Sequence, residues 1–342
     1  MNQANSRWQM PAEWAHHRGC YIAWPCRDEI WALGVQAAKD AYAQVIDAIA
    51  QVEPVTLLVN PAQLAEAQRW VTHHNVTFMA MPLNDSWARD ITPLFVQQGQ
   101  ARGAIDFGFN AWGEKFHPYD KDAAMGAQLL AHLKQQRPDF HAMSQALILE
   151  GGSIHVDGQG TLLTTAECLL HPKRNPHLSQ AQIEQQLMAS LGVDKVLWLP
   201  DGLWGDVDTD GHIDNIATFT QPGRILTMTT EDQRDPNYRR YQANIDALAG
   251  QTDAQGRLLE WVTIPQPERP IINDEPLALS YINYYLANDA VIIPAFGQAD
   301  YDREAATIIA AQFPEREVVA IDALPILAGG GGIHCITMQE PN

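Results

Sequence analysis

The chain has 342 residues, 46% hydrophobic and 18% charged, so it can build a sizeable core as one large domain. With 41 acidic against 22 basic residues, the formal net charge of -19 argues against nucleic-acid and anionic-membrane partners, which need a basic face, and favours a cationic ligand. The sequence shows no signal peptide and no run near the ~20 apolar residues of a membrane span, and its four dispersed cysteines fit no disulfide scaffold, so we expect a cytoplasmic protein with reduced thiols.

Helix-like and strand-like segments alternate along the chain. Helical spacing of apolar residues predicts helices at 37–50, 63–70, 123–136, 180–191, 238–248 and 302–311. Apolar or β-branched runs after them predict strands at 55–59, 76–79, 146–149, 196–199, 261–264 and 318–321. No low-complexity linker or charge block interrupts the pattern, so we expect one domain, residues 1–342, of roughly five or six strand-helix units.

This alternation by itself favours a doubly wound parallel sheet. A dinucleotide-binding site is disfavoured, because the glycine-rich fingerprint is missing after the first strand, where residues 59–61 (VNP) open the next helix. A serine nucleophile elbow is disfavoured as well. In the segment 151–155 (GGSIH), His155 stands where that motif needs a glycine.

Two carboxylates lie at the ends of predicted strands. Asp90 precedes the apolar strand candidate 94–96, and Glu150 ends the apolar run 147–149 just before Gly151. Charges at strand ends commonly reach solvent, so either residue alone has a simple structural explanation. Their value as candidates comes from occurring together with a thiol and an imidazole elsewhere in the chain.

The densest polar cluster is the segment 205–215 (GDVDTDGHIDN). Positions 1, 3, 5, 6 and 9 of an EF-hand calcium loop are occupied by Asp206, Asp208, Asp210, Gly211 and Asp214. Ala217 replaces the glutamate of position 12 and no helices flank the loop, so calcium is the minor alternative. In the other interpretation His212 and Asp214 lie along a strand that continues into 216–219, with both side chains on one face. An edge salt bridge would also explain that pair.

Near its end the chain has four consecutive glycines, 329–332, followed by Ile333, His334 and Cys335. Glycines contribute no buried side chain, so such a run indicates backbone that turns sharply or approaches a ligand closely. The segment 333–338 then resembles a short strand. A nucleophilic thiol would suit this position, although a flexible linker before a buried cysteine is the alternative when the run is considered alone.

Five groups of segments together resemble the agmatine deiminases, a peptidylarginine deiminase-like family of guanidino-group-modifying enzymes with the pentein fold. They are 10–14 (MPAEW) with 23–25 (AWP), 84–93 (NDSWARDITP), 109–113 (FNAWG), 150–153 (EGGS) with 162–170, and 208–215 (DTDGHIDN) with 329–341. The resemblance covers nearly the whole chain. It implies an α/β propeller of five ββαβ blades around a central pocket, without a metal or a cofactor.

The resemblance implies a role for each candidate residue. Cys335 would be the nucleophile and His212 the general acid and base, held and polarised by Glu150, while Asp90 and Asp214 would grip the guanidinium. Apart from the resemblance, the sequence offers candidates for further substrate contacts: Trp87 and Trp112, for which packing in the core is the alternative, Asp206 or Asp208, and Gly331. A planar cation with forked donors suits carboxylates on its edge and a thiolate attacking its central carbon. Agmatine would become N-carbamoylputrescine and ammonia, a step of polyamine biosynthesis toward putrescine.

The chain departs from the family pattern beside two catalytic positions. Ile91 and Thr92 stand where threonine and glycine are expected, and Gly332 stands where asparagine is expected. Alternative substrates are therefore free or peptidyl arginine or a shorter guanidine. A cysteine amidase or peptidase and a non-catalytic cation-binding protein are more remote alternatives.

The other cysteines and the assembly state are not assigned a function by the sequence. Cys20 and Cys26, with histidines at 16 and 17, match no common zinc spacing, and Cys168 is predicted to lie in the core. Assembly as a homo-oligomer is consistent with the sequence. The expected binding partner is a small cationic guanidino compound.

Overall fold

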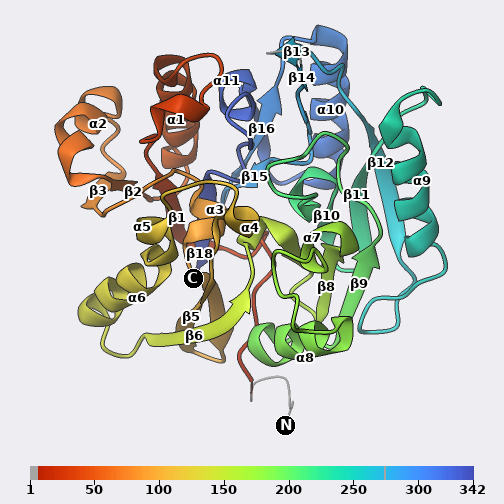
Figure 1. Cartoon of the computed structure of the whole chain (residues 1–342), viewed down its shortest axis with the longest axis horizontal. Coiled ribbons are helices and arrows are strands. Elements are labelled where there is room, and N and C mark those ends of the chain that lie inside the picture. The colour runs from red at the N-terminus through yellow and green to blue at the C-terminus, as the bar shows by residue number, and fades with distance from the viewer. Residues whose placement is uncertain (1–6, 273–274) are drawn as a thin grey trace.

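The computed structural model describes residues 7–272 and 275–342. Within them, one four-stranded sheet and four three-stranded sheets form a ring, and a two-stranded ribbon lies apart from them. Figure 1 shows the main helices on the outside of this ring, beside the sheets. The initial expectation of one doubly wound parallel sheet is therefore wrong, and the five-bladed propeller that the resemblance implied is right.

Four of the sheets repeat one topology: an antiparallel strand pair continues through a helical segment to a third strand that is parallel to the second. Their strands are β4 (Leu94–Gln98), β5 (Ala101–Gly108) and β6 (His141–Ile148); β7 (Ile154–Val156), β8 (Thr161–Thr165) and β9 (Lys195–Leu199); β10 (Ala217–Gln221), β11 (Arg224–Thr229) and β12 (Glu260–Pro265); and β15 (Tyr285–Leu286), β16 (Ala290–Ala295) and β17 (Glu317–Asp322). The connecting helices are α5 (Asp120–Ala123) and α6 (Met125–Gln136), α7 (Ala166–Leu169) and α8 (Gln180–Leu191), α9 (Pro236–Leu248), and α10 (Ala299–Gln312). Each blade is thus one ββαβ unit.

The remaining blade joins the two ends of the chain. β18 (Thr337–Pro341) pairs antiparallel with β1 (His17–Ala23), which pairs parallel with β2 (Val55–Val59), and β2 pairs parallel with β3 (Val76–Ala80). Helical segments fill the connections of this blade and precede β18: η2 (Asp28–Ile30), α1 (Val35–Ala50), η3 (Pro61–Gln63), α2 (Leu64–Trp70) and α11 (Leu324–Leu327). The last strand therefore closes the ring.

The core lies between each sheet and its helices. On α1 the side chains of Tyr42, Val45, Ile46 and Ile49 are fully buried, which is the three-to-four-residue spacing that predicted the helix. Trp24, at the end of β1, packs between Tyr42 and Trp70 of the helices beside it. The same amphipathic pattern explains why the predicted helices agree closely with those observed.

Capping residues and a helix-ending glycine define the ends of two of the helices. α8 begins with a capping box between Ser179 and Gln182 and ends at Gly192, which adopts a left-handed conformation. α9 begins after the capping residue Asp235 with Pro236 in its first turn.

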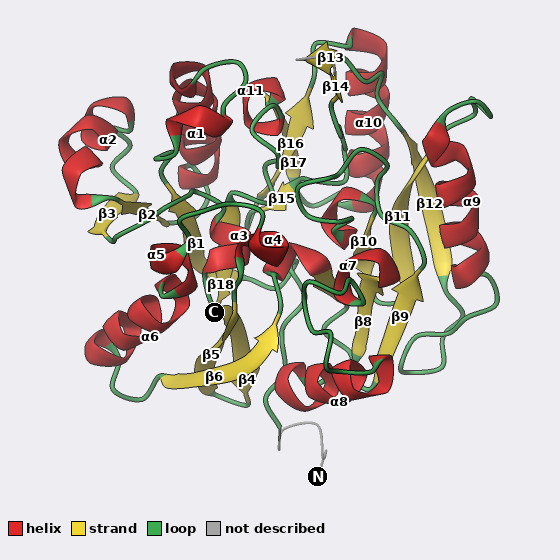
Figure 2. Ribbon diagram, in the orientation of Figure 1, coloured by secondary structure: helices red, strands yellow, loops and turns green. Residues whose placement is uncertain are grey.

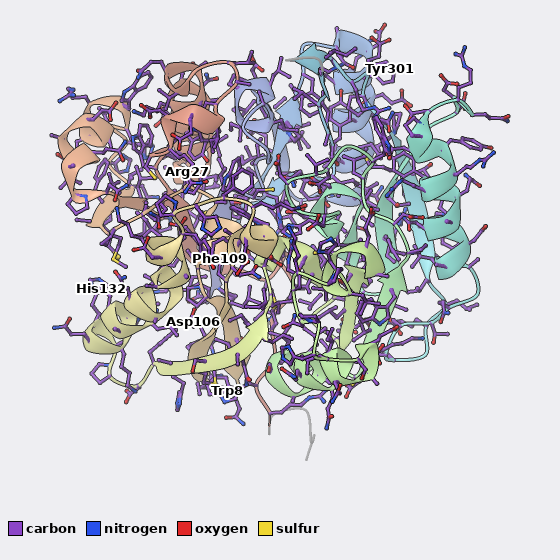
Figure 3. The ribbon with its side chains drawn as sticks, in the orientation of Figure 1. Trp8, Arg27, Asp106, Phe109, His132 and Tyr301 are labelled. Carbon is purple, nitrogen blue, oxygen red and sulfur yellow. The ribbon has the colours of Figure 1, made fainter. Side chains whose placement is uncertain are left out.

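Short irregular segments, rather than regular strands, occupy the middle of the ring. They are α3 (Ala88–Ile91), α4 (Ala111–Glu114), η4 (Gly151–Ser153) and η5 (Ile213–Asn215); the ribbon of β13 (Ile271–Ile272) and β14 (Glu275–Pro276) lies elsewhere. Figure 2 shows α3 and α4 among the central loops. In Figure 3, Phe109 lies close to this middle region, whereas His132 and Tyr301 lie toward the outer helices.

Two strand predictions near the candidate catalytic residues are wrong. Residues 212–214 do not continue β10; instead the Asn215 amide bonds the His212 carbonyl and the His212 amide bonds the Thr209 hydroxyl. Residues 333–336 form a turn rather than a strand, because the Ile336 amide bonds the Gly332 carbonyl, and β18 starts only at Thr337. In both places hydrogen bonds inside a loop replace those of a sheet.

Candidate functional site

Loops that lead into the first strand of a blade bring the candidate catalytic side chains together. Asp90 lies on α3 before β4, and Glu150 lies just before η4 and β7. His212 precedes η5, Asp214 lies on it, and Cys335 lies in the turn before β18. These residues come from four different blades, so only closure of the ring gathers them.

A small cavity opens beside these residues, and two of them, Asp90 and Cys335, line it. Its lining combines acidic, aromatic and glycine residues with one thiol: Ile30, Asp85, Trp87, Asp90, Trp112, Phe116, Asp208, Thr209, Gly329, Gly330, Gly331 and Cys335. Among the described residues that line it there is no lysine or arginine, so its charge is negative.

The Cys335 thiol contacts two side chains. Its Sγ lies 3.4 Å from Oδ2 of Asp214 and 3.2 Å from Nδ2 of Asn283. Burial, followed by the charges of Asp214 and Asp90, raises the pKa of this thiol well above its ordinary value. Without a cation in the cavity, the sulfur is therefore held as a thiol.

Asp214 is kept ionised by a second histidine. Nδ1 of His334 lies 2.9 Å from Oδ2 of Asp214, and Nε2 of His334 lies 2.9 Å from Oε1 of Glu13. Burial opposes ionisation of Asp214, but the hydrogen bond and charge of His334 lower its pKa below the ordinary value. Arg89 Nη1 donates to Glu13 at 3.3 Å, so a buried chain of alternating charges extends from Asp214 away from Cys335.

Asp90 has the opposite electrostatic surroundings. Its carboxylate accepts hydrogen bonds from Trp112 Nε1 and from the Gly152 amide, each at 2.9 Å. Burial is the largest influence and raises the pKa of Asp90; the charge of His212 opposes this shift, and the charges of Asp214 and Glu150 add to it. A bound cation would favour the ionised form of this carboxyl.

The imidazole of His212 lies between two acids. Nδ1 is 3.9 Å from Oδ2 of Asp90, Nε2 is 4.0 Å from Oε2 of Glu150, and neither nitrogen has a hydrogen-bond partner. Glu150 bonds Arg174 Nε at 2.6 Å through its other oxygen. The ring is thus fully buried near both acids with both nitrogens available for proton transfer.

Glycines allow these groups to converge. A Cβ at Gly152 would lie 2.6 Å from Nδ1 of His212, 2.8 Å from Oδ2 of Asp214 and 3.2 Å from Oδ1 of Asp90, so three functional groups surround one backbone position. In the run 329–332 a Cβ at Gly331 would approach Trp87 to 2.5 Å and Cβ of Cys335 to 3.1 Å. Close approach, rather than flexibility, therefore explains the glycine run.

The predicted contacts for the far end of the ligand separate into two groups. Trp87, Trp112, Asp208 and Gly331 line the cavity, whereas Asp206 does not. The carboxylate of Asp206 accepts hydrogen bonds from the amide and hydroxyl of Thr209 and from Asn215, so it shapes the loop and lines the neighbouring, larger depression.

Asp85 adds an acidic group to the cavity that the sequence analysis missed. It is almost fully buried beside Asp122, and Arg27 Nε lies 3.6 Å from its carboxylate. Burial, followed by the charge of Asp122, raises the pKa of Asp85 to about 7. Its position five residues before Asp90 in the segment 84–93 was the available signal.

The acidic residues of the segment 205–215 do not converge as calcium ligands would. Asp206 bonds its own loop, Asp210 pairs with Arg174 at 2.8 Å and with Lys115 at 2.6 Å, and Asp214 pairs with His334. Neighbouring elements are a short 3-10 turn and strands rather than two helices. The EF-hand alternative is therefore not supported.

One group of possible metal ligands occurs among the described residues. Glu150, Cys168 and His212 each offer a buried donor atom, and these atoms lie within 4.8 Å of one another. The Arg174 guanidinium already bonds Glu150 and places a positive charge beside this group, which opposes binding of a cation. Cys168 is fully buried, as expected for a core residue. None of the four cysteines, Cys20, Cys26, Cys168 and Cys335, forms a disulfide.

The two departures from the family pattern have different surroundings. Ile91 and Thr92 are buried around the end of α3 and do not line the cavity, and the Thr92 hydroxyl donates to the Ala88 carbonyl at 2.6 Å. Gly332 lies against Asn283, whose Oδ1 would be 2.3 Å from a Cβ at that position. The second departure therefore adjoins a residue that contacts Cys335, and the first does not.

Comparison with known proteins identifies the family to which the chain belongs. The Porphyromonas-type peptidyl-arginine deiminase family matches residues 9–341. The chain belongs to this family. A putative agmatine deiminase of Legionella pneumophila subsp. pneumophila is 47% identical over 334 residues, which cover 97% of this chain and 94% of the relative. An agmatine deiminase of Pseudomonas fluorescens is 40% identical over 356 residues, with 97% and 95% coverage.

Solved structures agree with this family membership. The agmatine deiminase of Enterococcus faecalis, described as catalyzing its reaction, superposes with a TM-score of 0.93 at 33% identity, covering 99% of this chain and 97% of that one. DDAH from Pseudomonas aeruginosa shares the fold alone, with a TM-score of 0.53 at 12% identity. Across the described residues, helices long and apolar enough to cross a membrane are not found.

Proposed function

We propose that this protein is an agmatine deiminase, which hydrolyses agmatine to N-carbamoylputrescine and ammonia through a covalent intermediate on Cys335. The names of the similar proteins support this activity. The observation that carries the proposal is the cavity itself: a thiol, acidic residues and aromatic rings line it, and the described lining residues include no lysine or arginine. Such a site selects a small molecule that is cationic at both ends.

The guanidinium binds first, with Asp90 and Asp214 at its edge. It is planar and permanently charged, so carboxylates can hold its plane while one face stays open to the sulfur. Its charge offsets that of the two carboxylates, which are the main charged neighbours that oppose ionisation of Cys335. Binding therefore lowers the thiol pKa, and the nucleophile becomes active only when the substrate is present.

Two half-reactions follow, with His212 moving the protons. His212 takes the thiol proton, Cys335 Sγ forms a bond to the guanidinium carbon, and the resulting imidazolium protonates the departing nitrogen. The C–N bond breaks, ammonia leaves, and a thiouronium remains on Cys335. Neutral His212 then takes a proton from water as the oxygen bonds to the same carbon. The C–S bond breaks, the hydroxyl proton of the adduct passes to the leaving sulfur, and the ureido product is released with Cys335 again a thiol. The proton on His212 is given up to the ammonia formed in the first half-reaction, which leaves as ammonium.

The far end of the cavity favours agmatine over arginine. Arginine carries a carboxylate there and would need a cationic partner. Arg89, the arginine beside Asp90 in the sequence, is buried and bonds Glu13, so it does not provide one. Trp87 and Trp112 suit the four-carbon stem of agmatine, and Asp208 supplies a negative charge for its amine.

A substrate panel tests this proposal. Agmatine, arginine, a blocked arginine peptide, shorter guanidines and a simple amide are each assayed for ammonia and ureido product, with wild type and Cys335→Ser. We expect agmatine to have the highest kcat/KM and Cys335→Ser to lose at least ~10³-fold of it. A thiouronium adduct should accumulate in His212→Ala and be detectable by mass spectrometry. Preference for arginine, release of ammonia from the amide alone, or full activity of Cys335→Ser would each contradict the proposal.

Location in the cytoplasm and assembly as a homo-oligomer are further parts of this proposal. The unpaired cysteines are compatible with a reducing compartment. Cell fractionation checks the first, and light scattering of the purified full chain checks the second.

A further inference from the structure

The fifth blade also sends a residue to the nucleophile. Asp90, Glu150, His212 with Asp214, and Cys335 account for four of the loops before a first strand. The fifth loop precedes β15, and it carries Asn283, whose side chain is completely buried against the turn that contains Cys335. No role is assigned to this residue by the mechanism above.

The contacts of Asn283 define which way its amide faces. Oδ1 accepts hydrogen bonds from the backbone amides of His334 at 2.9 Å and Cys335 at 3.4 Å. Both partners are donors, so the oxygen must face them and the NH2 group must face the other way. Nδ2 then lies 3.2 Å from Cys335 Sγ and 3.0 Å from Asn215 Oδ1, and the same sulfur lies 3.5 Å from Oδ1, so Nδ2 is the nearer of the two amide atoms.

We propose that Asn283 is a catalytic residue that donates a hydrogen bond to the Cys335 thiolate and holds its turn in the attacking position. This inference rests on the proposed function, in which Cys335 must ionise when the guanidinium binds. The amide donates one N–H to the sulfur while its oxygen anchors the two backbone amides beside it. One side chain thus aligns the nucleophile and stabilises its charge.

The surroundings of the sulfur make such a donor important. Asp90 on α3 and Asp214 on η5 oppose ionisation of the thiol, and Tyr42 on α1 lies near it. His334 and His212 influence the thiol pKa indirectly, through their contacts with Asp214 and Asp90 respectively. Bound substrate cancels the two negative charges, but this happens only in the complex. Asn283 is a neutral donor already in place, so it needs no rearrangement when the thiolate forms.

Gly332 makes room for this arrangement. A Cβ at position 332 would come within 2.3 Å of Oδ1 and 2.7 Å of Cγ of Asn283. The fourth glycine of the run therefore permits the close contact between the two loops.

The test compares Asn283→Ala and the isosteric Asn283→Asp with wild type. One measurement is the rate at which iodoacetamide alkylates Cys335 as a function of pH, followed by mass spectrometry without substrate; the other is the pH profile of kcat/KM for agmatine. We expect Asn283→Ala to move the thiol pKa upward by about one unit and to lower kcat/KM ~10–100-fold, mostly through kcat. Asn283→Asp should be more severely affected, because a carboxylate cannot donate and adds a negative charge beside the sulfur.

Ser280→Ala is the matched control, since Ser280 is buried in the same loop and its hydroxyl accepts from the Ile282 amide without contacting Cys335. It should keep the wild-type thiol pKa. The proposal is overturned if both Asn283 variants keep the wild-type alkylation profile, or if the Asn283→Ala profile is unchanged while kcat/KM falls. Because alkylation needs no substrate, it reports on Asn283 even if agmatine proves to be the wrong substrate. If Asn283→Ala fails to fold, the alkylation profile of the isosteric Asn283→Asp variant decides the question.

Discussion

Two buried carboxyl groups at the centre of the ring have oppositely shifted pKa values because their neighbours differ. Both are almost fully desolvated, which alone would raise both values. Asp214 has His334 at hydrogen-bond distance, whereas Asp90 has the indole of Trp112, which donates but carries no charge. Asp214 therefore stays ionised without a bound cation, whereas Asp90, which lines the cavity, responds to the arrival of one.

Replacing His334 tests this explanation at the residue scale. In His334→Gln, Asp214 loses its charged neighbour, so its pKa should rise toward and above the ordinary value. Asp214 would then be protonated over a wider range at low pH, and the acidic limb of kcat/KM should move to higher pH, with activity near pH 5 falling at least ~10-fold more than activity near pH 8. The pH profile of kcat/KM measures this directly.

His155→Gln is the control for that variant. His155 is also buried, and its Nε2 lies 3.6 Å from Glu13, but its hydrogen bonds go to Thr218 and Phe219. The acidic limb of the kcat/KM profile of His155→Gln should lie at the same pH as in wild type. Equal shifts in both variants would mean that general loss of buried charge, rather than the contact with Asp214, is responsible.

The element α4 consists of a single left-handed turn. Ala111, Trp112, Gly113 and Glu114 have φ values of 53°, 54°, 88° and 63°. This conformation costs roughly 1–2 kcal/mol for each residue other than glycine. Asn110 stabilises it, since its side chain accepts from the Gly113 amide at 2.9 Å. The turn directs the Trp112 indole at Asp90, so backbone strain is located in the cavity wall beside this carboxylate.

Glycine at position 114 tests whether this strain is real. Glu114 is exposed, so Glu114→Gly changes little except backbone freedom. We expect its free energy of unfolding to rise by up to ~1 kcal/mol, since glycine adopts positive φ without a steric penalty. Gln185→Gly, on the exposed side of the right-handed helix α8, should instead lower it by about 1 kcal/mol. Urea unfolding compares the two, and an equal loss in both would contradict the strain.

At the scale of the whole molecule, the ring depends on pairing between its two ends. β18 hydrogen-bonds to β1, and Met338 and Thr337 within it are fully buried. Glu340 reaches both Tyr21 on β1 and Arg137 of the neighbouring blade. Cys335, the proposed nucleophile, lies two residues before this strand, so closure of the propeller also positions it.

Shortening the chain tests the importance of closure. Removing residues 337–342 exposes the edge of β1 and leaves a cavity where the side chains of β18 are buried. The melting temperature should therefore fall by more than about 10 °C, and activity should be lost. Calorimetry of the shortened and full chains provides the comparison. Removing only Asn342, which lies outside β18, should leave both properties nearly unchanged. An active, equally stable protein without 337–342 would show that closure is unnecessary.

Much of this protein follows from its sequence alone. Amphipathic spacing predicts α8 with its observed bounds and β2 likewise, because helix and strand periods are local properties of a few turns of chain. Acidic composition favours a cationic ligand. The resemblance to a known family then supplies the propeller and the candidates Cys335, His212, Asp90, Glu150 and Asp214, whose catalytic roles stay proposals.

Other features exist only in the folded molecule. Glu13 meets His334 across 321 positions of the chain, and Asn283 meets Cys335 across 52. No local periodicity encodes such contacts, because they arise when ring closure brings loops of different blades together. The turns at 213–215 and 333–336 have the same origin: their apolar residues resemble strands, but hydrogen bonds and burial at the centre of the ring favour tight turns. The sequence therefore determines the segments and their chemistry, and tertiary packing decides which groups meet and which of them carry charge.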